Sequence, residues 1–271
     1  MRNLIIFLAL LLIITACNFP ISNQTSFDSD VATKVSVAKT ATTINNVLMT
    51  VTAIANPPSN TPAPIISTIT PTPTQDNFKD SLGMPAWRDD LNNGGNWSLN
   101  KPNTETPNVT IKVENGGLIM TRSVPYGGKN WWLNYQNIQD FYLEGKFITQ
   151  LCSGDDQYGL IIRAPSYFDG FGYYFTITCD GNFNLMRWDT NGAINLFNWE
   201  KPEAVHSGSN QINTLGIRAK GDLIRLYANG NMIKEFRDSS LIHTGHFGLF
   251  IDSRQTPGFT IILDEIAFWN L

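Results

Sequence analysis

The hydrophobic and polar positions divide the chain into three parts. Leu4 to Ile14 is one unbroken apolar run. Residues 40–75 contain no Asp, Glu, Lys or Arg and hold six of the 14 prolines. Beyond about Asp80, short apolar stretches alternate with turn residues, and no long helical period interrupts them. This last pattern predicts an all-β domain after a leader and a tether.

The turn signals in the third part are those of tight hairpins. Asn-Gly and Asp-Gly pairs supply the positive φ angles that two-residue turns need. "LIRLYA-NG-NMIKEF" and "YYFTITC-DG-NFNLMRW" each read as two strands joined by such a turn. Regularly spaced strands of this kind favour an antiparallel two-sheet jelly-roll sandwich. Other predicted strands are 110–113, 117–122, 130–136, 141–151, 157–163, 214–219, 245–251 and 259–268.

The first part is typical of a secretory signal, with Arg2 before the apolar run. It is short for a membrane span, which takes about 20 apolar residues. The following Ile14-Thr15-Ala16-Cys17 resembles the bacterial lipobox, in which the cysteine is lipidated. An ordinary signal peptide with a chance cysteine is the alternative. We expect export and lipid anchoring at Cys17, with palmitate-type acyl chains holding the domain outside the cytoplasm.

The domain boundaries follow from these patterns. Residues 1–16 form the expected signal peptide, and residues 17–79 form a low-complexity, disordered Thr/Pro-rich tether. Apolar positions at alternating spacings of four and three predict at most a weak helix over 31–55. Residues 80–271 form the jelly roll and suffice for one core.

Charge and cysteine content narrow the class of protein. A net charge of −4 and a pI of about 5.3 argue against a nucleic-acid-binding surface. Of the three cysteines, Cys17 is assigned to lipid, which leaves Cys152 and Cys179 for a disulfide in an exported chain. Strands 141–151, 157–163 and 172–179 are predicted to form one meander, with both cysteines at the same end of the sheet. The outer two would then lie too far apart for a bridge unless a loop bends across.

The order of several motifs resembles a known fold family. "DDQYGLIIRA", "GHFGLFI" and the closing "IILDEIAFW" occur in the order seen in concanavalin A-like and laminin-G-like jelly rolls. Among these the chain is most similar to domains named 3-keto-disaccharide hydrolases. The resemblance implies a jelly roll with a ligand-carrying sheet. It implies activity less strongly, because this fold hosts lectins, glycosidases and adhesion modules.

Catalytic motifs are not evident in the sequence. Family 16 glycosidases place their carboxylates at alternate positions of one strand, and no such run occurs here. A carboxylate pair split between strands stays open. We therefore predict a non-catalytic, surface-displayed carbohydrate-binding or adhesion-type module. The alternatives are a glycoside-processing enzyme and a structural envelope lipoprotein. Two or more carboxylates, or a metal, in one pocket would favour catalysis.

The stretch "NWWLNYQ" suggests where a glycan would bind. Neighbouring strand residues point to opposite faces, so Trp131, Leu133 and Tyr135 are predicted to face the core. The opposite face would offer aromatic and amide groups to a sugar. A second, loop-covered core is the alternative. The candidate ligand-binding residues are Trp132, Asn134, Gln136, Arg163, Tyr174, Thr176 and Trp188, whereas Trp87, Trp97, Trp199 and Trp269 are assigned to the core.

Cofactors and partners are predicted from the same features. Asp90 and Asp264 occupy the first and last strands, where a structural calcium ion could tie the two together. Strand-end carboxylates with water or backbone partners are the alternative. We expect a glycan or cell-surface polysaccharide as partner, contact with a membrane through the lipid, no nucleic acid, and a monomer.

Overall fold

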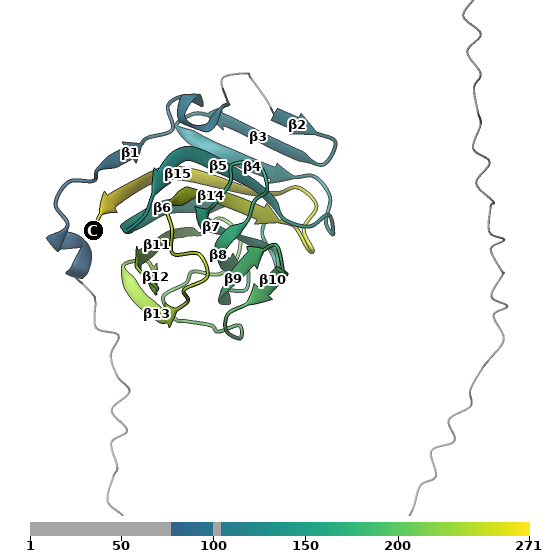
Figure 1. Ribbon diagram of the computed structural model, residues 1–271. Coiled ribbons are helices and arrows are strands. Elements are labelled where there is room, and N and C mark those ends of the chain that lie inside the picture. The colour runs from purple at the N-terminus through teal and green to yellow at the C-terminus, as the bar shows by residue number, and fades with distance from the viewer. Residues whose placement is uncertain (1–76, 100–103) are drawn as a thin grey trace, which may run out of the picture. The chain divides into compact units, whose positions relative to one another are not determined.

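The computed structural model describes residues 77–99 and 104–271, in which two antiparallel sheets pack face to face (Figure 1). This confirms the predicted jelly-roll sandwich. The first sheet has nine strands in the order β13-β12-β11-β6-β15-β4-β3-β2, and β1 pairs with β15. Its strands are β1 Trp87–Asp89, β2 Thr104–Thr106, β3 Val109–Glu114, β4 Gly117–Arg122, β6 Phe141–Thr149, β11 Ile212–Lys220, β12 Leu223–Ala228, β13 Asn231–Arg237 and β15 Phe259–Asn270.

The second sheet has six strands in the order β10-β9-β8-β7-β14-β5. The predicted hairpin turns join consecutive strands in both sheets. Asn115 and Asn229 adopt φ angles of 53° and 50°, as tight turns require. The strands of this sheet are β5 Asn130–Ile138, β7 Gln157–Ala164, β8 Gly172–Thr178, β9 Phe183–Asp189, β10 Gly192–Asn195 and β14 Gly245–Asp252.

The main core lies between the two sheets, and strand alternation decides which side chains enter it. Tyr173, Phe175 and Ile177 of β8 point into this core, while Tyr174 between them points to the outer face. Every residue of β7 and β8 is buried. The six-stranded sheet is therefore covered on both faces, and its sequence gives no simple alternation of apolar and polar residues.

The predicted disulfide is present, but the strands that flank its cysteines are arranged differently from the prediction. Cys152 and Cys179 are joined, with Cα atoms 5.5 Å apart. The proposed meander is wrong, because β6 belongs to the nine-stranded sheet whereas β7 and β8 belong to the other. The chain crosses between the sheets after β6. The bridge therefore links this crossing loop to the end of β8 and does not span a neighbouring strand.

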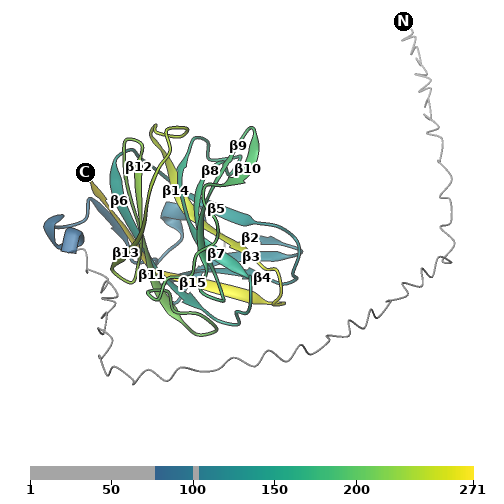
Figure 2. The same ribbon diagram turned by 90° about the horizontal axis from the view of Figure 1, so that it is seen from below.

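The domain is preceded by a 3-10 helix, η1 (Asn77–Ser81), which lies beside the C-terminus in both views (Figures 1 and 2). Phe78 and Leu82 pack on the outer face of the nine-stranded sheet, against Tyr142 and Trp269. Lys79 pairs with Glu144. These contacts begin before residue 80, the sequence-based start of the domain.

Several predictions fall outside the described residues. Cys17, the signal peptide and the weak helix at 31–55 all lie before residue 77, where the description of the structure begins. Within residues 77–99 and 104–271, no helix is long and apolar enough to cross a membrane. Lipid anchoring therefore stays a prediction.

Candidate functional site

The two neighbouring tryptophans of β5 do lie on opposite faces, but the predicted sides are reversed. Trp132 packs against the main core, and its indole N–H donates to the backbone carbonyl of Trp97 at 2.7 Å. Trp131 and Leu133 lie on the outer face of the six-stranded sheet. Tyr135, predicted to be core, is 49% exposed. Because both faces of β5 are covered by apolar groups, hydrophobicity alone could not choose between them.

Two other candidate residues, Asn134 and Arg163, are buried and bond to the protein's own backbone. Asn134 is fully buried beside a register shift in β5, and its side-chain oxygen accepts the N–H of the exposed Gln136. Arg163 has a fully buried side chain that donates to the carbonyls of Gln139 and Leu241. Its φ of 52° and the bulge opposite it turn the side chain toward these loops. These residues do not form one ligand-facing row.

Tyr174, Thr176 and Trp188 do lie on the outer face of the six-stranded sheet, as predicted. Tyr174 is fully buried, and its hydroxyl donates to the Gly170 carbonyl. Its ring centroid lies 6.0 Å from that of Trp188. With Trp131 and Phe250 they belong to a second apolar cluster on this face. The loop-covered second core that the sequence left as an alternative is therefore present, and a ligand role for these residues stays a prediction.

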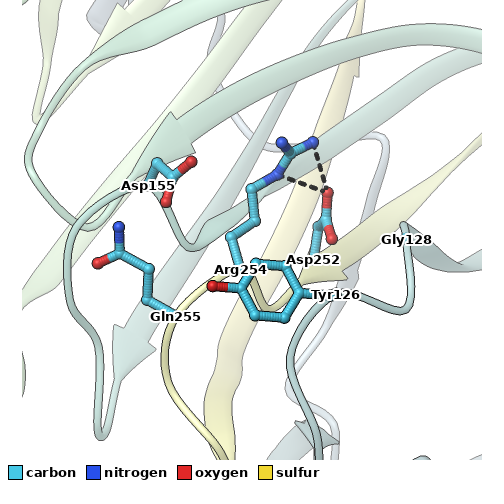
Figure 3. A pocket seen from close by; sticks show the side chains of 6 residues that line it. All are labelled: Tyr126, Gly128, Asp155, Asp252, Arg254 and Gln255. Atoms are coloured by element: carbon cyan, nitrogen blue, oxygen red, sulfur yellow. Dashed lines mark hydrogen bonds and ion pairs between the residues drawn. The ribbon is translucent and has the colours of Figure 1, made fainter. Parts of the chain in front are cut away.

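Beyond this second core, the same outer face carries two adjoining cavities that share Asp155 and Arg254. We call them together the charged groove. The first has a volume of about 390 Å³, and Figure 3 shows Arg254 between Asp252 and the pair Asp155 and Gln255. The second has a volume of about 410 Å³ and reaches the opposite edge of the sheet. Its walls are formed by Lys129, Asp155, Gln157, Thr178, Asn182, Met186, Asn195, Trp199 and Arg254.

The charged side chains of the groove are arranged around Asp252, whose side chain is 3% exposed. The Arg254 Nε–H donates to one Asp252 oxygen at 3.2 Å, and the Arg254 Nη2 forms an ion pair with the same oxygen at 3.2 Å. The Lys129 ammonium lies 3.6 Å from the same oxygen and donates to Gln157 at 2.5 Å. Burial lowers the pKa of Lys129 to about 8; Asp252 offsets part of this shift and Arg254 adds to it.

Three loops hold the walls of the groove in place. The Cys152–Cys179 bridge joins the loop before β7, which carries Asp155, to the turn that carries Asn182. The Cys179 N–H also donates to the Asp156 carbonyl at 2.9 Å. The hydroxyls of Ser153 and Thr256 lie 2.8 Å apart and connect the first loop to the segment of Arg254. The groove is therefore framed by covalent and hydrogen-bonded loops on one end of the sheet.

The assignment of Trp199 to the core is wrong. Its side chain is 40% exposed and forms part of the groove wall. Trp199 lies in a bulge between Leu196, which bonds to β9, and Glu200, which pairs with Phe183. The other three tryptophans are more enclosed. Trp97 is fully buried in the main core, Trp87 packs against that core, and Trp269 lies under η1.

The carboxylates predicted for calcium have cationic partners in the structure. Asp90 accepts from Arg88 at 2.7 Å, and Asp264 accepts from Lys146 at 2.6 Å. The first and last strands are neighbours, since β1 pairs with the end of β15. Among residues 77–99 and 104–271, no three His, Cys, Asp or Glu side chains cluster as metal ligands. The calcium site stays a prediction.

Fold and groove together define a jelly-roll domain with a charged groove on the outer face of one sheet. Residues 86–268 match the family described as the 3-keto-alpha-glucoside-1,2-lyase-like domain, and the chain belongs to this family. The sequence-based resemblance is thereby confirmed. No curated protein matches the sequence.

Solved structures with a similar fold include both binding modules and glycosidases. A carbohydrate-binding module, CBM66, from Bacillus subtilis is 15% identical with a TM-score of 0.44, over 65% of this chain and 96% of that chain. A family 16 endo-glucanase from Bacteroides ovatus is 8% identical with a TM-score of 0.48, over 67% and 99%. A laminarinase catalytic domain from Thermotoga petrophila is 11% identical with a TM-score of 0.44, over 69% and 97%. At these identities the similarity is one of fold.

Proposed function

We propose that this domain cleaves a glycoside carrying a 3-keto group, by eliminating the substituent at C1. One observation carries the proposal: Asp155 and Asp252 meet two cationic side chains, Lys129 and Arg254, in one groove. Two or more carboxylates in one pocket are the feature expected from the sequence to favour catalysis over binding. Family membership supplies the class of substrate.

The proposed reaction begins with the proton on C2, which the neighbouring C3 carbonyl makes acidic. A base removes this proton, and the electron pair is held as an enolate. The pair then forms a C1–C2 double bond as the C1–O bond breaks, and the departing oxygen takes a proton. The reaction therefore needs a proton carrier on one side of the sugar and positive charge near the carbonyl oxygen.

Asp155 is the proposed proton carrier. Its side chain is exposed, lines both cavities and has no side-chain hydrogen bond or ion pair among the described residues. Asp252 is less suitable, because Arg254 and Lys129 already hold its carboxylate. These two cations are the proposed stabilisers of the enolate oxygen. Preorganised positive charge at the site of a developing oxyanion is a large term in catalysis.

The remaining groove walls are suited to holding a sugar. Asn182, Asn195 and Gln157 offer amide donors and acceptors for hydroxyl groups, and Trp199 offers a half-exposed indole for an apolar ring face. The volume of each cavity lies within the range of small-molecule sites, about 300–1,000 Å³.

Incubation with methyl 3-keto-α-glucoside tests the proposal. We expect the protein to release methanol and to form a conjugated enone. The enone is monitored by its ultraviolet absorbance. Asp155→Asn should reduce the rate by roughly 10²–10⁴-fold, the usual worth of a general acid–base. Asp180→Asn, an exposed carboxylate in the next loop, is the matched control. Unchanged substrate at all protein concentrations would refute the proposal.

Glycan binding without cleavage is the second candidate function. It is favoured by the exposed indole of Trp199 beside several amides, and by the ion pairing of Asp252. Binding of unoxidised oligosaccharides on a glycan array, with no turnover of the 3-keto compound, would support this function over the first.

We further propose that the domain is displayed on a lipid anchor at Cys17. The support is the order of apolar run, small residues and cysteine in the N-terminal sequence. Cells fed labelled palmitate should label the wild-type chain and not Cys17→Ser. Equal labelling of the two would count against the anchor.

A further inference from the structure

Lys129 is an unusual lysine because most of its side chain is buried in the wall of the groove. The side chain is 16% exposed, and its nitrogen lies 5.0 Å from the centre of the Phe250 ring. It lies just before β5, in the loop that also carries Tyr126 and Gly128 of the first cavity. Lys129 forms part of the second cavity's wall.

The surroundings of Lys129 allow it to lose its proton at little cost. A buried carboxylate left without a cation would be strongly destabilised. Asp252 avoids this, because the Arg254 guanidinium pairs with its oxygen through one hydrogen bond and one further ion-pair contact, whatever the charge of Lys129. The Gln157 oxygen, which accepts from Lys129, can also accept a weaker hydrogen bond from the neutral amine.

We propose that Lys129 is a nucleophile that forms an imine with the keto group of a carbonyl-bearing sugar in the groove. This inference rests on the proposed function, since the 3-keto group is the carbonyl concerned, and it replaces the electrostatic role given there to Lys129 by a covalent one. An unprotonated lysine amine in a desolvated pocket is the side chain that reacts with ketones in this way.

The step balances without any further reagent. The neutral nitrogen attacks the C3 carbonyl carbon and forms a C–N bond, while the carbonyl oxygen takes a proton and becomes a hydroxyl. The nitrogen gives up both of its protons to this oxygen, one as the hydroxyl forms and one as the hydroxyl leaves as water, so that a neutral C=N bond remains. Protonated, this imine draws electrons from the C2–H bond more strongly than the ketone does. Water later reverses the sequence and frees the lysine.

Several charged groups face Lys129 and set the pH at which the step begins. Burial and the positive charge of Arg254 lower its pKa to about 8, against the pull of Asp252. Asp155 lies in the same cavity. At pH 7 roughly a tenth of such amines are neutral, compared with less than about a thousandth for an ordinary lysine near 10.4. Reaction at Lys129 should therefore exceed that at surface lysines on the order of a hundredfold at neutral pH.

Reductive trapping tests the imine directly. The full-length wild-type protein is incubated with methyl 3-keto-α-glucoside and sodium cyanoborohydride, then digested and mapped by mass spectrometry. We expect a stable adduct, the mass of the sugar less one oxygen, on Lys129. Lys146, which is exposed and paired with Asp264, is the internal control and should carry at least about tenfold less. Methyl α-glucoside, which has no ketone, should give no adduct.

Variants separate the imine from the charge of the lysine. Lys129→Arg keeps a cation beside Asp252 but cannot form the imine, so it should lose both adduct and elimination while still binding the ketone in calorimetry. Lys146→Arg should change neither. Melting curves check that each variant is folded, and the wild-type peptide map does not depend on any variant.

The outcomes distinguish this inference from the proposed function. Elimination without label at Lys129, or elimination retained in Lys129→Arg, overturns the imine and leaves the proposed function standing. No binding and no elimination of the ketone by the wild type overturns both. Label spread evenly over Lys129 and Lys146 shows chance reaction and also overturns the imine.

Discussion

The carboxylate of Asp156 accepts a hydrogen bond from the backbone N–H of Arg254 at 2.6 Å. The same oxygen accepts from Gln255 at 2.7 Å and from Thr256 at 3.3 Å, and the other oxygen accepts from Ser153 at 3.3 Å. Asp156 is fully buried. One carboxylate therefore fastens the loop of Arg254 to the loop of Asp155, and these two loops form the shared wall of the groove.

Replacing Asp156 should disturb both stability and the groove. Asp156→Asn puts an amide group among N–H donors, and hydrogen bonds to a charged acceptor are worth about 1.5–3 kcal/mol each. We expect a loss of unfolding free energy of more than about 2 kcal/mol in urea titration. Asp155→Asn, one residue away and exposed, should stay within about 0.5 kcal/mol of wild type. Equal stability of the two variants would contradict the role of Asp156.

Removing the disulfide should loosen the same end of the sheet. Cys152→Ala with Cys179→Ala is expected to cost about 2–5 kcal/mol, the usual loss for a native bridge. Hydrogen exchange should rise first in the loops that carry Asp155 and Asn182, because the bridge joins them. Faster exchange confined to other parts of the domain would argue against this view of the loops.

The fold could be predicted from sequence because its signals are local. Asn229-Gly230 fixes a turn through the φ angles of two residues, and the flanking runs fix the strands. The pairing of strands is not local, so the sequence placed the strand before Cys152 in the wrong sheet. The motif order carried the resemblance without showing which strands share a sheet.

The groove was missed for a related reason. Lys129, Asp155 and Arg254 come from three loops that are distant in sequence, and only the order of β5, β14 and β7 in the sheet brings them together. Trp132 was placed on the ligand side because it alternates with the amides of Asn134 and Gln136, although both faces of β5 are in fact covered by apolar groups. The sequence held one signal for these residues. Lys129 and Arg254 are both charged and both lie just outside the end of a strand.

The tryptophans should respond differently to truncation. Trp132→Ala removes a core indole that also donates to Trp97, and should cost about 3–5 kcal/mol of unfolding free energy. Trp199→Ala removes a half-exposed ring and should cost less than about 1 kcal/mol. The same change should weaken sugar binding roughly 2- to 10-fold. Chemical denaturation and calorimetry on both variants check this, and the reverse order of stability losses would contradict the face assignment.

The pKa of Lys129 makes stability depend on pH in a definite direction. In the folded protein it is lowered to about 8, whereas in the unfolded chain it is near 10.4. Between these values the unfolded chain binds more protons, so this group makes folding more favourable as pH rises. Wild type should gain about 2–3 kcal/mol relative to Lys129→Met between pH 7 and pH 10. If the difference in unfolding free energy between the two proteins stays constant from pH 7 to pH 10, folding does not lower the pKa of Lys129.

The N-terminal helix should contribute to the stability of the domain. Phe78 packs on Tyr142, and the Arg218 guanidinium lies 3.9 Å from the Phe78 ring centre. A chain starting at Asn77 should therefore be more stable than one starting at Asp80, by about 1–2 kcal/mol for half-burying one aromatic ring. Phe78→Ala in the longer chain should reproduce the loss. Met84→Ala, at a side chain that is 90% exposed, is the control and should leave the melting temperature unchanged. If both chains melt together, the helix rests on the sheet without stabilising it.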